Sequence, residues 1–392
     1  MIDAVSLLVI VAASAVAALS ATLLAPRLVL PVVVVELLLG ILIGPQLADL
    51  AQIDAATRFF SDLGLGMLFF FAGYEIDFER IRGGPLRLGG AGWLISLALA
   101  YGFAGVLILG DVIVSDLYTG TALATTAIGT LIPILRDTGE LRTRFGTYLL
   151  AAGAMGEFGP ILLISLVLTS KHPAHEALIL VLFVVLAVLT GLLAVRSTLV
   201  GWPLLERTLE TSSQLAVRLA VLLIFGLVAV ASELGLDLLI GGFVAGMITR
   251  LALRGREVAI FESKVTAVGY GFLIPFFFVV SGMAFDVDSL FESGGALLKL
   301  PLFAALFLVV RGLPALLLYR RELAVRDRTA LAFFCATELP LVVAITTIAR
   351  ANGDMRSSTA AALVGAAIIS TLAYPLIGLR LRRPAHAAAA VA

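Results

Sequence analysis

The sequence carries little charge and almost no cysteine or histidine. Asp, Glu, Lys and Arg make up only 14% of its 392 residues, whereas about 25% is usual in soluble domains. The formal net charge is zero, so a general attraction to nucleic acid is excluded. The single cysteine, Cys335, excludes an internal disulfide bond and a cysteine-rich metal site. The three histidines argue against a histidine-based metal enzyme, and no cofactor is expected.

What the sequence has in abundance is apolar length. It is 61% hydrophobic, with a mean hydropathy of +1.10, so lipid rather than water is the main solvent of its surface. The first apolar run, residues 4–25, follows the acidic Asp3 and has no basic residue before it. These features favour a transmembrane helix over a cleaved signal peptide, with cleavage near Ser14 as the alternative.

Turn residues and charge clusters divide the chain into 13 predicted spans, of which the ninth is short. A span requires about 20 apolar residues. An odd number of spans places the two ends of the chain on opposite sides of the membrane. The predicted spans are 4–25, 28–45, 59–76, 88–110, 115–135, 144–168, 177–195, 216–233, 237–251, 268–285, 297–319, 329–349 and 358–380.

The distribution of basic residues supports this count. Of the 27 Lys and Arg residues, 21 fall in one set of alternate loops and in the C-terminal tail, five fall in the other set, and Arg311 lies inside a span. Cytoplasmic loops are the ones enriched in Lys and Arg. The pattern therefore predicts a multi-pass cell-membrane protein with its N-terminus outside and its C-terminus in the cytoplasm.

A weak internal repeat relates the third and tenth spans. Residues 68–77 and 275–286 each place Asp four residues after Gly, behind a cluster of Phe; chance in a Phe-rich chain is the alternative. An offset of seven spans inverts the second copy, as is common in secondary transporters. The predicted division is 1–195 (spans 1–6 and linking span 7), a cytoplasmic linker 196–215, a second repeat 216–383 and a tail 384–392.

The most informative residue is Glu157, near the middle of the apolar segment 146–168. A carboxylate at that depth is rare, costly and usually functional. It must either stay protonated or bind a cation, and an exchanger of protons for metal cations requires that choice. The alternative is a structural glutamate that is hydrogen-bonded to another helix.

Two spans are interrupted near mid-depth by Thr, Gly or Pro. The fifth contains Thr125, Thr126 and Pro133, and the twelfth contains Glu338 and Pro340. Paired interruptions in corresponding positions of two halves indicate a binding site, and freed carbonyls and Thr hydroxyls suit Na⁺ or K⁺. Simple proline kinks are the alternative.

Arg311 and Glu36 are the other charged residues inside predicted spans. Arg311 keeps its proton in practice, so we expect it to compensate the charge of Glu157, Glu338 or the carbonyl ends of the broken helices; snorkelling to the cytoplasmic face is the alternative. For Glu36, structural pairing and a role in transport remain equally open. The pair Gly242 and Gly246 predicts a close helix-packing face.

These residues resemble the cation:proton antiporter superfamily, in its Kef-type and NapA-type sodium(potassium)/proton exchanger branch. The matching segments are 36–45, 65–77, 124–129, 275–286 and 336–343. The resemblance implies an all-α fold of two inverted-topology six-helix repeats with two crossing discontinuous helices, and a homodimer. It places the ion-binding carboxylate at Glu157 and the basic residue at Arg311. The family usually has Asp at the first of these positions and Asp or Asn at the one before it, which is Gly156 here.

A Kef-type channel-antiporter also carries a cytosolic nucleotide-binding domain. Since this sequence stops at Ala392, we expect such regulation to be absent or to lie on another chain. The predicted function is exchange of H⁺ for Na⁺ or K⁺ by alternating access, electroneutral because one carboxylate exchanges one proton. Glu157, Thr125 and Thr126 would bind the ion. The alternatives are a sodium-coupled symporter of related fold and an intramembrane enzyme or receptor.

Overall fold

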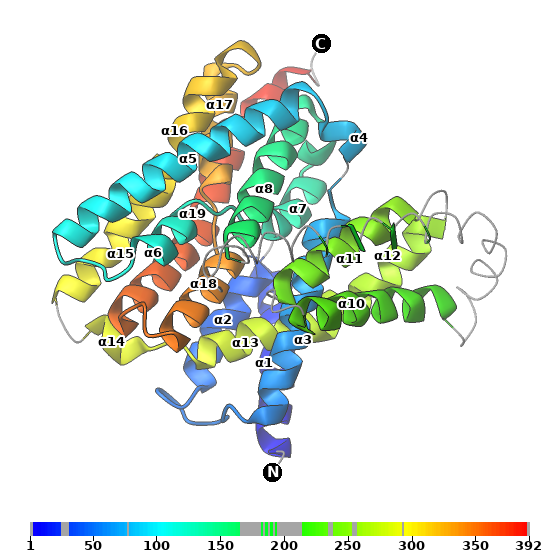
Figure 1. Ribbon diagram of the computed structural model, residues 1–392, viewed down its shortest axis with the longest axis vertical. Coiled ribbons are helices and arrows are strands. Elements are labelled where there is room, and N and C mark those ends of the chain that lie inside the picture. Colours follow the sequence, from blue (N-terminus) through cyan, green and yellow to red (C-terminus); the bar gives the residue numbers. More distant parts are fainter. Residues whose placement is uncertain are drawn as a thin grey trace. The chain divides into compact units, whose positions relative to one another are not determined.

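The computed structural model describes residues 3–24, 31–76, 78–164, 214–233, 238–252, 257–291 and 294–389, and the helical residues 182, 185, 186, 189, 190 and 193. The described part of the chain is helical, with short turns between helices (Figure 1). The seventh predicted span, 177–195, and the predicted linker, 196–215, lie largely outside the described residues.

Helices cover the other twelve predicted spans. Their bounds in chain order are α1 Ala4–Leu24, α2 Val32–Ile43, α3 Ala55–Tyr74, α4 Phe78–Ile81, α5 Gly84–Leu109, α6 Asp116–Leu123, α7 Ile128–Asp137, η1 Glu140–Arg142, α8 Arg144–Leu163, α10 Leu215–Glu233, α11 Leu238–Ala252, α12 Glu257–Val268, η3 Gly269–Leu273, α13 Ile274–Met283, α14 Val287–Phe291, α15 Gly294–Phe307, η4 Leu308–Gly312, α16 Leu313–Leu318, η5 Tyr319–Arg321, α17 Val325–Cys335, α18 Pro340–Ala351 and α19 Ser357–Ala389.

Membrane-length helices are a main feature of the described residues. Seven are long and apolar enough to cross a bilayer, and three shorter apolar helices accompany them. This agrees with the polytopic membrane protein predicted from composition. Helix starts differ from the predicted span starts where polar residues cap or extend the helix. α3 begins at Ala55, four residues before the predicted span, because Asp54 and Thr57 form a capping box.

The two predicted interruptions are real breaks in the helices. α6 ends at Leu123 and α7 begins at Ile128, while α17 ends at Cys335 and α18 begins at Pro340. Proline fits the first turn of α18 because that position needs no backbone N–H. Residues 124–127 and 336–339 therefore lie between helices, and some of their backbone groups bond to other segments.

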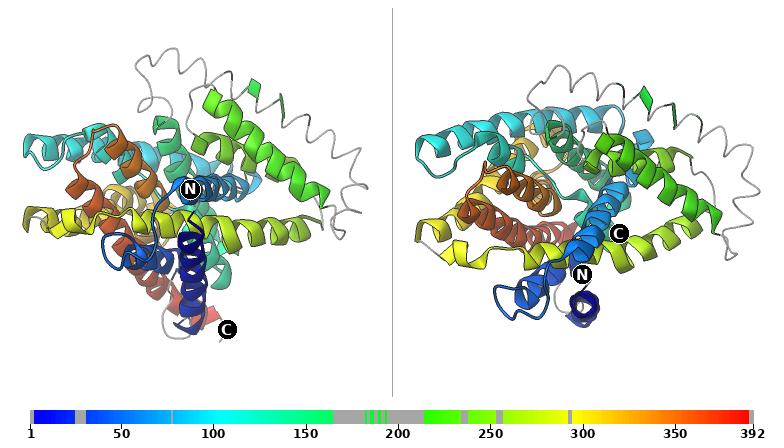
Figure 2. Two further views of the ribbon diagram at one scale, coloured as in Figure 1. Left: turned by 90° about the horizontal axis from the view of Figure 1, so that it is seen from below. Right: turned by 60° about the horizontal axis from the view of Figure 1, so that its bottom comes forward.

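Residues 1–14, 51–77 and 161–280 form one compact unit. Within it, α3 packs on α11 (Figures 1 and 2). The contact is backbone to backbone: a Cβ on Gly242 would lie 2.6 Å from the carbonyl oxygen of Gly66, and one on Gly246 would meet the carbonyl of Phe70. The predicted packing role of these two glycines is confirmed.

Residues 15–50, 78–160 and 281–392 form the second compact unit. It contains both helix breaks and α19, which contacts α15, α17 and α18. Among the described residues, the π-helical segments η3 and η4 interrupt longer helices, and η4 carries Arg311. Such segments are frequent at functional sites because they redirect a side chain.

Candidate functional site

The two helix breaks of the second unit bond directly to each other. The backbone N–H of Ala127 donates to the carbonyl of Thr337 at 2.8 Å. The Thr126 hydroxyl donates to the carbonyl of Cys335 at 2.5 Å. Each break therefore forms hydrogen bonds with backbone groups of the other that have no partner within a helix. Such bonds are needed where little water is present. This pairing explains how unwound backbone survives inside the protein.

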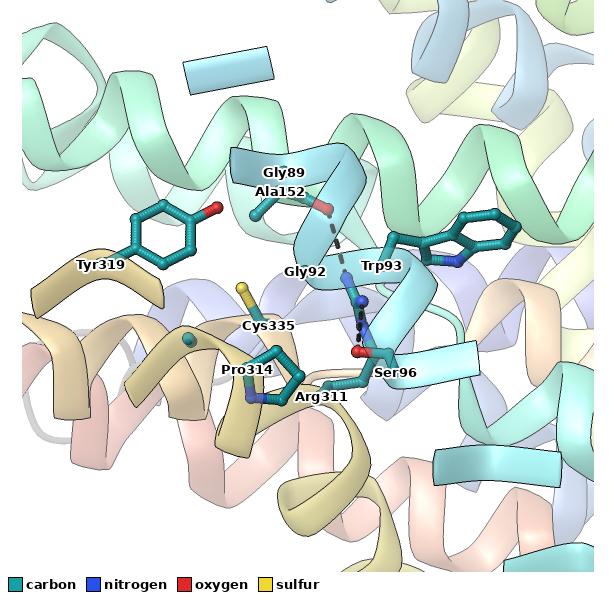
Figure 3. A pocket seen from close by; sticks show the side chains of 10 residues that line it. Gly89, Gly92, Trp93, Ser96, Ala152, Arg311, Pro314, Tyr319 and Cys335 are labelled. Carbon is teal, nitrogen blue, oxygen red and sulfur yellow. Dashed lines mark hydrogen bonds between the residues drawn. The ribbon is translucent and has the colours of Figure 1, made fainter. Parts of the chain in front are cut away.

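Arg311 reaches the same place from η4 and is 4% exposed. Its Nε donates to Thr126 Oγ1 at 2.9 Å. One terminal nitrogen donates to Ser96 Oγ at 3.1 Å and the other to the Ala152 carbonyl at 3.2 Å (Figure 3). Among the residues that the structure describes, all of its partners are neutral oxygens. The guanidinium therefore places a fixed positive charge beside the break at 124–127.

Glu157 follows Gly156 on α8 and is 4% exposed. The Gly156 carbonyl accepts the backbone N–H of Thr126 at 2.9 Å, so the Glu157 backbone adjoins the break. A Cβ on Gly156 would lie 2.7 Å from Thr126 Oγ1 and would also meet the Arg311 guanidinium. Arg311 and Thr126 thus occupy the space that a side chain at position 156 would need.

Glu338 lies in the second break and is fully buried. Its Oε2 accepts the Thr125 hydroxyl at 3.0 Å, which joins the two breaks a third time. Within the described part of the chain, its Oε1 has no hydrogen-bond partner. The backbone is fixed from α19, because the Glu338 N–H donates to Ser370 Oγ at 3.0 Å and its carbonyl accepts the Thr371 hydroxyl at 3.2 Å.

Glu36 is also buried, at 3% exposure on α2. Within the described residues its Oε2 accepts no hydrogen bond. The hydrogen bonds of the site join Thr125, Thr126, Arg311 and Glu338, and Glu157 adjoins them. Among the described residues, none of these bonds reaches Glu36. Both readings of Glu36 therefore remain predictions.

A small cavity borders Arg311 (Figure 3). Its lining includes Ser96, Tyr319 and Cys335, and about 10 Å³ of it is open to the centre of a water molecule, which is roughly the room that one water needs. The Tyr319 hydroxyl is buried there, and no described group bonds to it. A bound water is the natural partner for this hydroxyl.

Several residues that hold the site were not singled out in the sequence. Ser96, Ser370 and Thr371 are small polar residues in apolar spans. The only signal that the sequence gives for them is a hydroxyl group among apolar side chains. The described residues contain no group of three or more His, Cys, Asp or Glu side chains suited to a metal ion. The oxygens of the site are instead hydroxyls, carbonyls and single carboxylates, which are ligands for hard cations.

Comparison with known proteins gives consistent matches. The profile described as "sodium/hydrogen exchanger, transmembrane" matches residues 14–378. The putative Na⁺/H⁺ antiporter YjbQ of Bacillus subtilis is 26% identical over 374 residues, which cover 89% of this chain and 59% of that protein. The Na⁺/H⁺-K⁺ antiporter GerN of Bacillus cereus is 26% identical over 293 residues, 72% of this chain and 73% of GerN.

A solved structure supports the fold. The sodium proton antiporter MjNhaP1 from Methanocaldococcus jannaschii superimposes with a TM-score of 0.65 and covers 95% of this chain and 97% of that chain. At 17% identity this likeness concerns the fold alone. It confirms the predicted all-helical, multi-pass membrane architecture.

Proposed function

This chain belongs to the sodium/hydrogen exchanger family, and from that premise we propose that it exchanges H⁺ for Na⁺ or K⁺ by alternating access. Family membership confirms the resemblance seen in the sequence and makes the chain a transport protein rather than an enzyme. Similarity to proteins named as Na⁺/H⁺ and Na⁺/H⁺-K⁺ antiporters supports this choice of ions.

Glu157 is the proposed exchange group, which binds a proton or a cation in turn. The observation that carries this assignment is its position: it is buried, and it directly follows the residue whose carbonyl accepts the Thr126 N–H. A buried carboxylate without a charged guest is strongly disfavoured. A proton or a Na⁺ ion would each neutralise it, and one would exclude the other.

Thr125 and Thr126 are the proposed neutral ligands, with carbonyls of residues 124–127. In the structure their hydroxyls bond to Glu338 and to the Cys335 carbonyl. The Glu338 carboxylate and the Cys335 carbonyl now accept hydrogen bonds from these hydroxyls. A bound cation would instead be coordinated by these acceptor oxygens. Hard oxygen ligands at a flexible break suit a weakly bound monovalent ion, which must also leave.

Electroneutral exchange is the proposed stoichiometry. Gly156 supplies no carboxylate, and Arg311 carries a positive charge, which cannot bind a cation. Glu157 alone then trades one proton for one cation. Glu338 is the group that would change this ratio, since it is a second buried carboxylate with one oxygen that no described residue bonds. Arg311 lowers the free energy of the charged form of either carboxylate through its fixed charge.

The alternative of a sodium-coupled symporter requires a site for an organic solute. The cavity beside Arg311 admits about one water molecule, so the proposed ion site itself has no room for such a solute. An inverted-repeat arrangement, a homodimer, and an outside N-terminus remain parts of our proposal, supported by the sequence pattern and by the family.

The test is transport by purified protein in liposomes, read as cation-dependent pH change with Na⁺ and K⁺. We expect Glu157→Gln to abolish exchange while the protein stays folded. Asp111→Asn, which removes an exposed carboxylate paired with Arg356, is the control and should transport normally. Exchange that persists in Glu157→Gln would move the site elsewhere, and a strong dependence on membrane potential would contradict electroneutrality.

A further inference from the structure

A second hollow of the same unit lies at the polar ends of α5 and α16. It measures about 750 Å³ and is lined by Gly84, Arg87 and Leu88 of α5, Leu317 and Leu318 of α16, and Arg320, Arg321 and Glu322 just beyond it. The two helices contact each other (Figure 1). We call this hollow the arginine pocket. Its volume is in the range of ordinary ligand sites.

The three arginines of the pocket have no ion-pair partner among the described residues. Arg87, Arg320 and Arg321 are exposed, and in the described part of the chain none of them forms a hydrogen bond or an ion pair. Three guanidinium groups that line one hollow repel each other, so their arrangement is unfavourable until an anion arrives. A planar guanidinium matches phosphate oxygens in a bidentate manner.

The one acidic residue of the lining does not supply that anion. Glu322 accepts the Tyr148 hydroxyl at 2.7 Å, and it also pairs with Arg144 outside the pocket. The pKa of Glu322 is lowered because Tyr148 and Arg144 donate hydrogen bonds to its carboxylate. Glu322 therefore stays ionised at neutral pH with its charge already matched, and the arginine pocket keeps a net positive charge.

The wall of the pocket is apolar. Leu88, Leu317 and Leu318 complete the lining, and Leu317 is 58% exposed. An inorganic anion gains nothing from leucine, whereas a lipid brings acyl chains that cover it. Moreover, Arg87, Arg320 and Arg321 belong to the loops that the distribution of basic residues assigns to the cytoplasmic side, where anionic lipids concentrate.

We propose that the arginine pocket binds the phosphate-bearing headgroup of an anionic membrane lipid, with the first acyl carbons against Leu317. Arg320 and Arg321 bond to the phosphate, and Arg87 approaches it from α5. The first-turn N–H groups of α5 begin at Gly84 and add positive potential on the same side. This binding is independent of which cation the protein transports.

The experiment measures lipid binding by native mass spectrometry of purified full-length protein, titrated with phosphatidylglycerol or phosphatidylcholine. The variant is Arg320→Gln with Arg321→Gln. The matched control is Arg142→Gln with Arg326→Gln, which removes the same charge from two exposed arginines outside the pocket. Thermal unfolding in phosphatidylcholine micelles checks that both variants fold, and Arg87→Gln is a milder second variant.

We expect wild type and control to bind phosphatidylglycerol alike and to prefer it to phosphatidylcholine. The Arg320/Arg321 variant should bind it about thirty-fold more weakly, or about 2 kcal/mol at about 1.4 kcal/mol per tenfold, since each basic residue at a membrane surface contributes about 1 kcal/mol. Unchanged phosphatidylglycerol binding in that variant and in Arg87→Gln would overturn the proposal. Full displacement of the lipid by millimolar inorganic phosphate would overturn the choice of a lipid and indicate a free anion.

Discussion

Thr126 carries three of the contacts that hold the proposed ion site together. Its backbone N–H donates to Gly156, its hydroxyl donates to the Cys335 carbonyl, and the same oxygen accepts Nε of Arg311. One residue thus joins a break, α8, the second break and η4. A neighbouring substitution that displaces Thr126 should therefore disturb all of these contacts at once, even where the substituted residue is not itself a proposed ion ligand.

The first prediction concerns the space beside Thr126. In Gly156→Ala the new Cβ meets Thr126 and Arg311, and overpacking of this kind destabilises by about 1–3 kcal/mol. We expect a lower melting temperature in detergent and slower exchange in liposomes. Gly105→Ala in α5 is the control, because a Cβ there meets nothing within 4 Å and alanine favours the helix by about 0.5–1 kcal/mol. A Gly156→Ala protein as stable and active as wild type would show that the site tolerates this crowding.

At the scale of elements, the sequence predicts helices well and contacts between them poorly. Both helix breaks could be predicted, because Thr, Gly and Pro interrupt apolar runs at matched places. The start of the tenth span was placed at 268, whereas α12 begins at Glu257, because a charged helical extension does not look like a membrane span. The bond from Arg311 to Ser96 joins residues 215 positions apart, and nothing in a single sequence marks such a pair.

The end of α19 is a second example of a contact that sequence patterns miss. Arg382 donates to both oxygens of Glu140, at 3.0 and 2.7 Å, and to Asp327 at 2.6 Å. Its guanidinium also lies 4.4 Å from the centre of the Phe145 ring. In the sequence Arg382 is one of many basic residues near a span end, and it would be expected to face water. In the structure it is instead buried, and it joins α19 to Glu140 and Asp327.

We therefore predict that Arg382→Met is strongly destabilising. Removing one partner of a buried ion pair costs about 3–5 kcal/mol, because Glu140 loses the guanidinium that donates to both of its oxygens. The measurement is thermal unfolding in detergent. Arg380→Gln, an exposed neighbour on the same helix, should leave the melting temperature nearly unchanged. Equal melting temperatures for Arg382→Met and Arg380→Gln would mean that the cluster contributes nothing to stability.

At the scale of the whole molecule, the sequence predicts the number of spans and the side of the membrane on which each loop lies. The described helices do not test these two predictions. Family, fold and composition agree on a multi-pass membrane protein. Orientation depends only on the split of basic residues between alternate loops, and the seventh span, which makes the count odd, falls largely outside the described residues. A direct test of sidedness is therefore informative.

Cysteine labelling supplies that test, because the native Cys335 is 2% exposed and should not react. Thr138→Cys lies in a loop predicted to be cytoplasmic, and Ala351→Cys lies near a loop predicted to be outside; both positions are exposed. In intact cells, a membrane-impermeant maleimide should label only Ala351→Cys. Thr138→Cys should react only after the cells are permeabilised. The reverse pattern would invert the molecule, and labelling of both from outside would refute the span count between them.

The central claim is that one buried carboxylate binds either a proton or a cation. The most direct measurement is calorimetric titration of purified protein with Na⁺ and K⁺ in buffers of different ionisation enthalpy, which counts protons released per cation bound. At acidic pH we expect about one proton per cation in wild type, falling toward zero as the site deprotonates, and no binding in Glu157→Gln. Cation binding without proton release across the pH range, or wild-type binding by Glu157→Gln, would contradict the account.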